Sequence, residues 1–338
     1  MYSANSKIFN STALSVLDLS PINEDSHARQ SFKNSVELAQ HVEKWGFNRY
    51  WLAEHHNMPG IGSSATSVLI GHIAGATNSI RVGSGGIMLP NHAPLVIAEQ
   101  FGTLESIYPG RIDLGLGRAP GSDQATAYAL RRTLQSSGND FPEQLAELQA
   151  YFEPNRDARV RAFPGEGLDI PIWLLGSSGF SAQLAAQEGL PFSFASHFAP
   201  AYTMQALQLY HQNFKPSKYL QEPYAMLGVN IIAAETDEKA HWLATSQQQQ
   251  FLSLTRGTPT RLQPPIDNMN EVWSAQERVA IEQTLDSRST IVGSPETVRE
   301  KLMRLIQETK ANELIINSQI FDQEERLRSY EIVAEMMN

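Results

Sequence analysis

The chain has 338 residues, and 41% hydrophobic content is enough to build a sizeable core as one large domain or two ordinary ones. Its 36 acidic and 26 basic residues give a net charge of −10, which argues against nucleic acid or an anionic membrane surface as a partner. There is no cysteine, which excludes disulfides, thiolate nucleophiles and cysteine-ligated metals.

The N-terminal stretch MYSANSKIFN has no basic start followed by an apolar run, as a signal peptide would. No segment approaches the roughly 20 apolar residues of a membrane span. We therefore expect a soluble, cytoplasmic protein.

Eight strand-like segments follow one another along the chain, and segments with helical periodicity separate most of them. The strands are expected at residues 13–20, 47–55, 80–89, 111–117, 170–176, 190–196, 224–234 and 312–319. This alternation implies parallel strands with helical crossovers, and eight repeats in about 300 residues favour a closed (β/α)8 TIM barrel over an open doubly wound sheet. No linker divides the chain, so we expect one domain over residues 1–338.

Two stretches are longer than a plain barrel needs. The connection from residue 118 to 169 includes an extra helical piece around 141–152. A second tract, rich in proline and glycine, begins at Phe251 and predicts an extended loop insertion near residues 250–285. Loops that follow barrel strands tend to cover the mouth of the active site.

The first segment with candidate chemistry is YWLAEHHN, where Glu54, His55 and His56 end the second strand. Successive strand residues point to opposite faces, so one metal ion cannot easily bind both histidines. We expect one histidine to face the barrel axis as an acid, a base or a hydrogen-bond donor. The alternative is a structural histidine with satisfied hydrogen bonds.

The next strand, in VGSGGIMLPNHAP, contains glycines at positions 83, 85 and 86. Glycine weakens a strand interior and often marks the close approach of a ligand or an unusual backbone. We interpret His92, between two prolines, as a turn residue.

The fourth strand, RIDLGLG, places Ile112, Leu114 and Leu116 on one face, which we expect to pack against the helices. Arg118 follows the strand at the end where barrel enzymes keep their chemistry. A dinucleotide-binding fingerprint is rejected because Pro120 stands where the third glycine belongs. The remaining alternative for Arg118 is an ion pair with a surface carboxylate.

The fifth strand runs into Gly176-Ser177-Ser178-Gly179 and then a helix. Ser178 or Ser181 can simply cap this helix. Free N–H groups and hydroxyls at a helix N-terminus also form a phosphate site. Arg118 comes from the neighbouring strand at the same rim, and an arginine beside such a turn fits a phosphate dianion.

Taken together, EHHN, the block from Arg81 to Asp123 and GSSGFSAQLAAQ resemble the bacterial luciferase-like flavin monooxygenases, in particular the single-chain luciferase family oxidoreductases. The resemblance implies a (β/α)8 barrel that takes reduced FMN from a separate flavin reductase. With molecular oxygen it would form a C4a-peroxyflavin and oxidise a small, aldehyde- or ketone-like molecule. It also implies a homodimer, and the apolar helix from Ser64 to Ala76 could supply the contact or simply pack in the core.

The resemblance assigns roles to particular residues. Arg118 matches the arginine that contacts the flavin phosphate, and the turn Gly176–Ser181 matches the phosphate loop, with Gly176, Ser177, Ser178 and Ser181 as its contact residues. His55 matches a histidine implicated in flavin chemistry. Gly85 and Gly86 match a non-prolyl cis peptide beneath the isoalloxazine ring.

Two departures from luciferase argue against light emission. Gly117 stands where luciferase has a reactive cysteine, and the acidic residue of its phosphate loop is replaced near Ser177. Three other functions stay open: hydride transfer with a deazaflavin, flavin binding without turnover, and a metal-dependent barrel hydrolase, which the His55–His56 spacing disfavours. No residue identifies the substrate.

Overall fold

The computed structural model describes residues 6–118, 124–131 and 140–337. Eight parallel strands form the barrel, and all eight predicted strand segments are confirmed. They are β2 (Thr12–Asp18), β3 (Arg49–Leu52), β4 (Arg81–Ser84), β6 (Ile112–Gly117), β7 (Ile172–Gly176), β8 (Phe192–Phe194), β9 (Ala225–Ala233) and β11 (Glu313–Asn317). The barrel is closed because β2 pairs with both β3 and β11.

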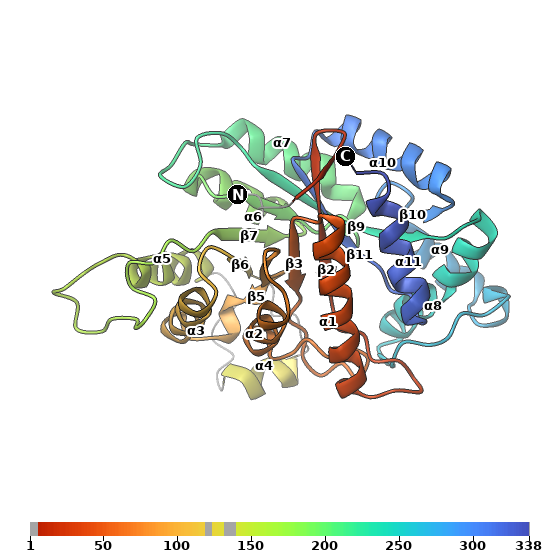
Figure 1. Ribbon diagram of the computed structural model, residues 1–338, viewed down its shortest axis with the longest axis horizontal. Helices are drawn as coiled ribbons and strands as arrows, with labels where there is room; N and C mark the ends of the chain where they lie inside the picture. The colour runs from red at the N-terminus through yellow and green to blue at the C-terminus, as the bar shows by residue number, and fades with distance from the viewer. Residues whose placement is uncertain (1–5, 119–123, 132–139, 338) are drawn as a thin grey trace.

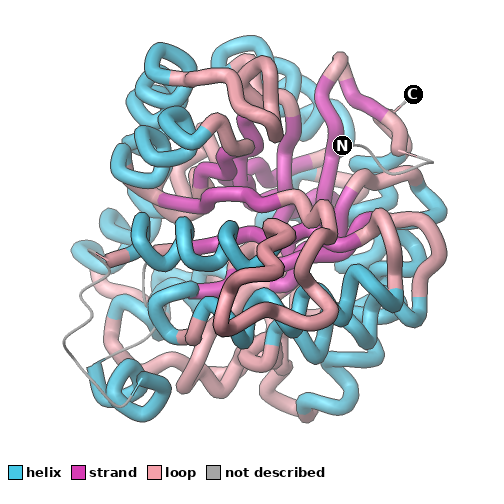
Figure 2. Tube along the Cα trace, turned by 90° about the vertical axis from the view of Figure 1, so that its left-hand side faces the viewer, coloured by secondary structure: helices cyan, strands magenta, loops and turns pink. Residues whose placement is uncertain are grey.

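Helices surround the strands, as Figures 1 and 2 show. They are α1 (Ala28–Trp45), α2 (Thr66–Ala76), α3 (Pro94–Ile107), α4 (Gln124–Arg131), α5 (Phe141–Phe152), α6 (Gly179–Glu188), α7 (Thr203–Asn213), α8 (Asp237–Thr255), α9 (Ala275–Thr284), α10 (Pro295–Thr309) and α11 (Gln323–Ala334). Short 3₁₀ turns lie at Leu89–Asn91, Pro200–Tyr202 and Met269–Glu271. In the described part of the chain, none of the helices combines the length and apolar character needed to cross a bilayer.

Three short strands lie outside the predicted set or split a predicted segment. They are β1 (Ile8–Phe9), which is antiparallel to β2, β5 (Ile87–Met88), which pairs with β6, and β10 (Thr290–Gly293), which extends the sheet beside β9. β10 has only four residues and follows the irregular tract, so its sequence carried little strand periodicity.

The predicted insertion near residues 250–285 has more helix than the sequence indicated. Phe251 belongs to the last turns of α8, which runs to Thr255, and α9 occupies residues 275–284. The irregular part is therefore the stretch between these two helices. The expectation of a loop starting at Phe251 was wrong because glycine and proline begin only after the helix, at Gly257 and Pro259.

The apolar core lies between the barrel and its helices, and Ile112, Leu114 and Leu116 are fully buried there as predicted. Inside the barrel, near the amino-terminal ends of the strands, lies a different layer. Arg49 bonds Asp113 at 2.7 Å and Glu313 at 3.0 Å, and Arg81 bonds Asp113 at 2.6 Å. This buried ion network closes the bottom of the barrel and leaves the carboxyl-terminal mouth as the open end.

Candidate functional site

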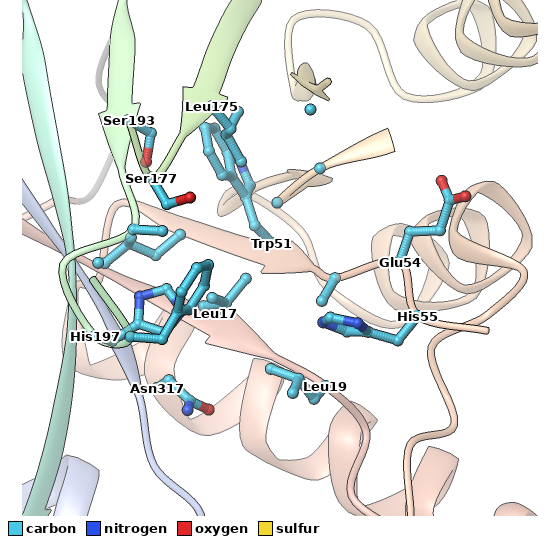
Figure 3. Close-up of a pocket in the computed structure, with 18 of the residues that line it drawn as sticks. Leu17, Leu19, Trp51, Glu54, His55, Leu175, Ser177, Ser193, His197 and Asn317 are labelled. Carbon is cyan, nitrogen blue, oxygen red and sulfur yellow. The ribbon is translucent and has the colours of Figure 1, made fainter. Parts of the chain in front are cut away.

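A cavity of about 410 Å³ opens at the carboxyl-terminal mouth of the barrel. Its volume lies within the usual range for small-molecule pockets. All eight residues predicted from the sequence line it: His55, Gly85, Gly86, Arg118, Gly176, Ser177, Ser178 and Ser181. The structure therefore brings together residues from the ends of several strands (Figure 3).

Arg118 lies directly beside the turn that opens α6. Its guanidinium carbon is 4.2 Å from the centre of the Phe180 ring, in the first turn of that helix. β6 and β7 are hydrogen-bonded neighbours, which brings the two segments to one rim. No carboxylate among the described residues forms an ion pair with Arg118, so the described structure does not support the surface ion-pair alternative.

The N-terminus of α6 leaves its polar groups available. Ser178 has the extended backbone of an N-cap residue, with φ −144° and ψ 173°, yet its side chain makes no capping hydrogen bond. The capping alternative is thus not supported for Ser178. A Cβ at Gly176 would lie 2.6 Å from the Cβ of Ser181, so glycine lets the turn fold closely around the helix start. The first N–H groups of the helix face this turn without intrahelical acceptors.

Gly85 and Gly86 form a smooth part of the cavity wall. The peptide bond between them is cis, as the resemblance implied. A Cβ at Gly85 would lie 2.7 Å from Leu17 Cδ1, and one at Gly86 would lie 2.7 Å from the carbonyl oxygen of Gly115. Gly83 does not line the cavity, so the expected ligand approach there was wrong; its missing side chain makes room for Asp113.

The two adjacent histidines point different ways, as predicted, although β3 ends at Leu52 and both histidines lie in the loop that follows it. His55 lines the cavity, whereas His56 Nε2 lies 2.8 Å from Glu54 Oε1. Burial lowers the pKa of His55 and outweighs the opposing effect of the neighbouring Glu54. His55 is therefore neutral near pH 7, and its ring has one nitrogen that donates and one that accepts.

Glu54 is held in place by three donors. Besides His56, His92 Nε2 lies 2.9 Å from Glu54 Oε1, and the Met88 amide donates to Oε2 at 2.9 Å. Burial alone would raise the pKa of Glu54, but the bonds from His56 and His92 lower it to about 2. His92 closes the turn Leu89–Asn91, as interpreted from the sequence, and its side chain also bonds Glu54, a contact that the sequence did not indicate because the two residues lie 38 positions apart.

Sequence reasoning missed His197, which follows β8 and lines the same cavity. Its Nδ1 atom has no hydrogen-bond partner among the described residues. Burial lowers the pKa of His197 to about 4; the Gly228 backbone opposes this shift, and the nearby His55 adds to it. Figure 3 shows His55 and His197 on opposite sides of the cavity. A histidine just after a predicted strand, at the mouth end, was the signal available.

Helix α8 supplies part of the cavity's apolar wall through Phe251 and Leu254. The sequence placed Phe251 in a covering loop, and the structure places it in a covering helix. Within the described ranges, no group of three or more histidine, aspartate or glutamate side chains is arranged to hold a metal ion. The metal-dependent alternative therefore finds no support in the described site.

A family model described as luciferase-like monooxygenase matches residues 12–313. The chain belongs to this family. YvbT of Bacillus subtilis (strain 168), an uncharacterized protein, is 61% identical over 96% of this chain and 96% of its own. A luciferase-like monooxygenase of Escherichia coli (strain K12) is 55% identical, again over 96% of each chain. The protein is accordingly an enzyme, a luciferase-like flavin-dependent monooxygenase.

Solved structures agree on the fold. Apo-MsnO8 superposes with a TM-score of 0.86 at 34% identity, over 96% of this chain and 98% of that one. The oxygenating constituent of 3,6-diketocamphane monooxygenase from Pseudomonas putida, solved with FMN, gives a TM-score of 0.71 at 17% identity, over 96% and 97%. An F420-dependent secondary alcohol dehydrogenase gives 0.67 at 14% identity, over 96% and 98%. The last two comparisons concern the fold alone.

Proposed function

We propose that this protein is the oxygenase component of a two-component system, using reduced FMN and O2 to oxidise a small organic substrate of aldehyde or ketone type. The observation that carries the proposal is the cluster of Arg118, Phe180 and the α6 N-terminus at one end of the cavity. A cation, free N–H groups and unengaged hydroxyls at one point match a phosphate dianion.

The residues present fit FMN on three counts. Arg118 has no carboxylate partner within the described residues, and the Ser178 hydroxyl is not used for capping. The Gly85–Gly86 wall offers no side chain that would block a flat ring. Arg118 and the turn Gly176–Ser181 would hold the phosphate, and Gly85 and Gly86 would support the ring. When bound, the reduced flavin supplies the electrons that activate O2.

The chain's own residues have separate tasks in this proposal. His55, neutral because of burial, can accept a proton at its bare ring nitrogen or donate one from the other. Glu54 bonds His56 and His92, and these bonds hold the three side chains in place at this edge of the cavity. Phe251 and Leu254 of α8 help to exclude water from the reacting groups.

The test supplies reduced FMN anaerobically, admits O2 and follows oxygen uptake with a panel of aldehydes and ketones. We expect a substrate to lower the hydrogen peroxide yield and to gain an oxygen atom from isotope-labelled O2. Peroxide at the same yield for every compound would indicate a flavin-binding protein without turnover. Hydride transfer from reduced deazaflavin without oxygen uptake would contradict the monooxygenase proposal and favour the deazaflavin alternative.

We further propose that a cytoplasmic flavin reductase supplies the reduced FMN. The sequence has no dinucleotide-binding fingerprint for NADH or NADPH, because Pro120 stands where the third glycine belongs. The protein alone, given NADH or NADPH and oxidised FMN, should not consume oxygen, whereas added reductase should start the reaction. Direct reduction of FMN by the protein would contradict this partner assignment.

We also propose that a second copy of the chain packs on α2 and α3. α2 contains no charged residue, and Val68 on it is 70% exposed. Val96 and Ile107 on the neighbouring α3 are 42% and 58% exposed. Exposed apolar side chains on two adjacent helices are typical of a subunit interface. Light scattering should give twice the mass of 37.5 kDa, and Val68→Asp should give the monomer; a monomeric native protein would contradict the proposal.

A further inference from the structure

A relay of buried amide side chains runs from β9 to the cavity. Asn230 on β9 and Asn317 at the end of β11 are register partners on adjacent strands. Gln319 lies two residues beyond Asn317, just past the end of β11, and its side chain bonds that of Asn317. Asn230, Asn317 and Gln319 are 0%, 5% and 1% exposed, and the last two line the cavity.

The direction of the relay is fixed at its first member. Asn230 Nδ2 donates to the carbonyl oxygen of His197 at 2.9 Å, where an amide oxygen would meet only another acceptor. The Oδ1 atom of Asn230 therefore accepts from Asn317 Nδ2 at 3.1 Å. Asn317 Oδ1 in turn accepts from Gln319 Nε2 at 3.0 Å. Each link sets the orientation of the next amide.

The relay ends in an acceptor without a partner. Once Gln319 donates through Nε2, its Oε1 atom has no hydrogen-bond partner among the described residues, and the residue itself lines the cavity. Buried acceptors in folded proteins are almost always paired, and an unpaired one is costly. The relay prevents the amide from exchanging its oxygen and nitrogen, and because Gln319 lines the cavity we take a ligand there as the source of the missing partner.

The surroundings of Gln319 indicate which kind of ligand group would bind there. Around the closed barrel β11 is four strands away from β6, so Gln319 lies across the mouth from Arg118. Leu17, Leu19 and Ile315 line the cavity from the adjoining strands. Among the described residues that line the cavity, the acidic and basic side chains are those of Arg118 and Glu54. Glu54 is already bonded to His56 and His92. This end suits an uncharged group.

We infer that Gln319 is a specificity-determining residue that accepts a hydrogen bond from a neutral N–H or O–H donor on the molecule filling this end of the cavity. The inference rests on the proposed function. Two sources share this chemistry: the imide N–H of the flavin ring, and a hydroxyl or amide N–H on an otherwise apolar substrate. Carboxylates and ammonium ions are disfavoured because no free counter-charge is available at this end.

The first arm of the test concerns the flavin. Dissociation constants of FMN and of its N3-methylated analogue, which lacks the imide donor, are measured by flavin fluorescence for the native protein and for Gln319→Met. The second arm concerns the substrate. Binding of hexanamide and of N,N-dimethylhexanamide is measured by calorimetry on the same two proteins with and without FMN. Gln221→Met, an exposed glutamine on the surface, is the matched control.

In the native protein, one of the two compound pairs should show roughly tenfold tighter binding of the compound that carries the N–H donor. Gln319→Met should remove this difference in affinity. A preference in the first arm assigns the donor to the flavin, and one in the second arm assigns it to the substrate. Equal binding within both pairs by the native protein would overturn the inference without any variant, as would a preference that Gln319→Met retains. Failure to bind FMN at all would contradict the proposed function, while the amide pair would still test Gln319.

Discussion

The two ends of the barrel interior are built in opposite ways. At the bottom, Arg49 bonds both Asp113 and Glu313, and Tyr224 adds a hydrogen bond to Glu313 at 2.9 Å. At the mouth, Gln319 Oε1 and His197 Nδ1 have no partner among the described residues. At the bottom the charged groups bond one another, and at the mouth two buried polar atoms lack a partner beside the cavity.

The same contrast appears in the titrating groups. Burial alone would raise the pKa of Asp113, but Arg49 and Arg81 lower it below its ordinary value. At the mouth, burial lowers the pKa of His197, and this effect outweighs the opposing effect of the Gly228 backbone. The bottom layer therefore keeps Asp113 charged, whereas at the mouth burial keeps His197 neutral and the bonds from His56 and His92 keep Glu54 charged.

The largest expected loss of stability comes from a substitution in the buried ion network at the bottom of the barrel. Asp113→Ala leaves Arg49 and Arg81 buried without their shared partner, and removing one member of a buried ion pair costs about 3–5 kcal/mol of unfolding free energy. Denaturant unfolding measures this loss. Asp286→Ala, which removes the surface pair with Arg288, should cost less than about 1 kcal/mol. Equal losses would mean that the buried network does not stabilise the fold.

A second prediction tests the mouth through its pH dependence. The pKa of His197 is about 4 in the folded protein against an ordinary 6.5. Between these values the unfolded chain binds a proton that the folded protein does not. Stability should therefore fall as the pH is lowered from 6.5 to 4, by roughly 1–3 kcal/mol from this group.

The check is denaturant unfolding across that pH range for the native protein and for His197→Gln. The variant should show a flatter dependence than the native protein. An identical slope for both proteins would show that His197 does not titrate as described.

The smallest expected effects concern two serines at the N-termini of helices. Ser274 caps α9 in a reciprocal capping box, whereas Ser178 at the start of α6 makes no capping bond. Ser274→Ala should cost about 1 kcal/mol of stability. Ser178→Ala should change stability by less than about 0.5 kcal/mol and weaken FMN binding by roughly 3- to 10-fold. A large stability loss at Ser178 would restore the capping interpretation.

Much of the barrel could be predicted because its signals are local. RIDLGLG alternates apolar and small or polar residues, and this period alone placed Ile112 outward and Arg118 at the mouth. The close approach of Arg118 to the α6 turn followed from the rule that successive barrel strands are neighbours. These inferences need only the chain order.

The parts that were missed depend on contacts between distant segments. His92 meets Glu54 across 38 positions, and the amide relay joins Asn230 to Asn317 across 87. No local pattern marks such pairs, because each residue alone resembles an ordinary polar side chain. Gln319 in particular becomes notable only when its amide orientation is fixed by the register of β9 and β11.

The most direct test of the account compares the binding of FMN and riboflavin, which differ by the phosphate, in the native protein and in Arg118→Ala. The native protein should prefer FMN, and the variant should lose roughly 10- to 100-fold of that preference while its unfolding free energy stays within about 1 kcal/mol of native. Equal affinity of the native protein for both flavins, or an unchanged preference in the variant, would contradict the assignment of this rim as the phosphate site.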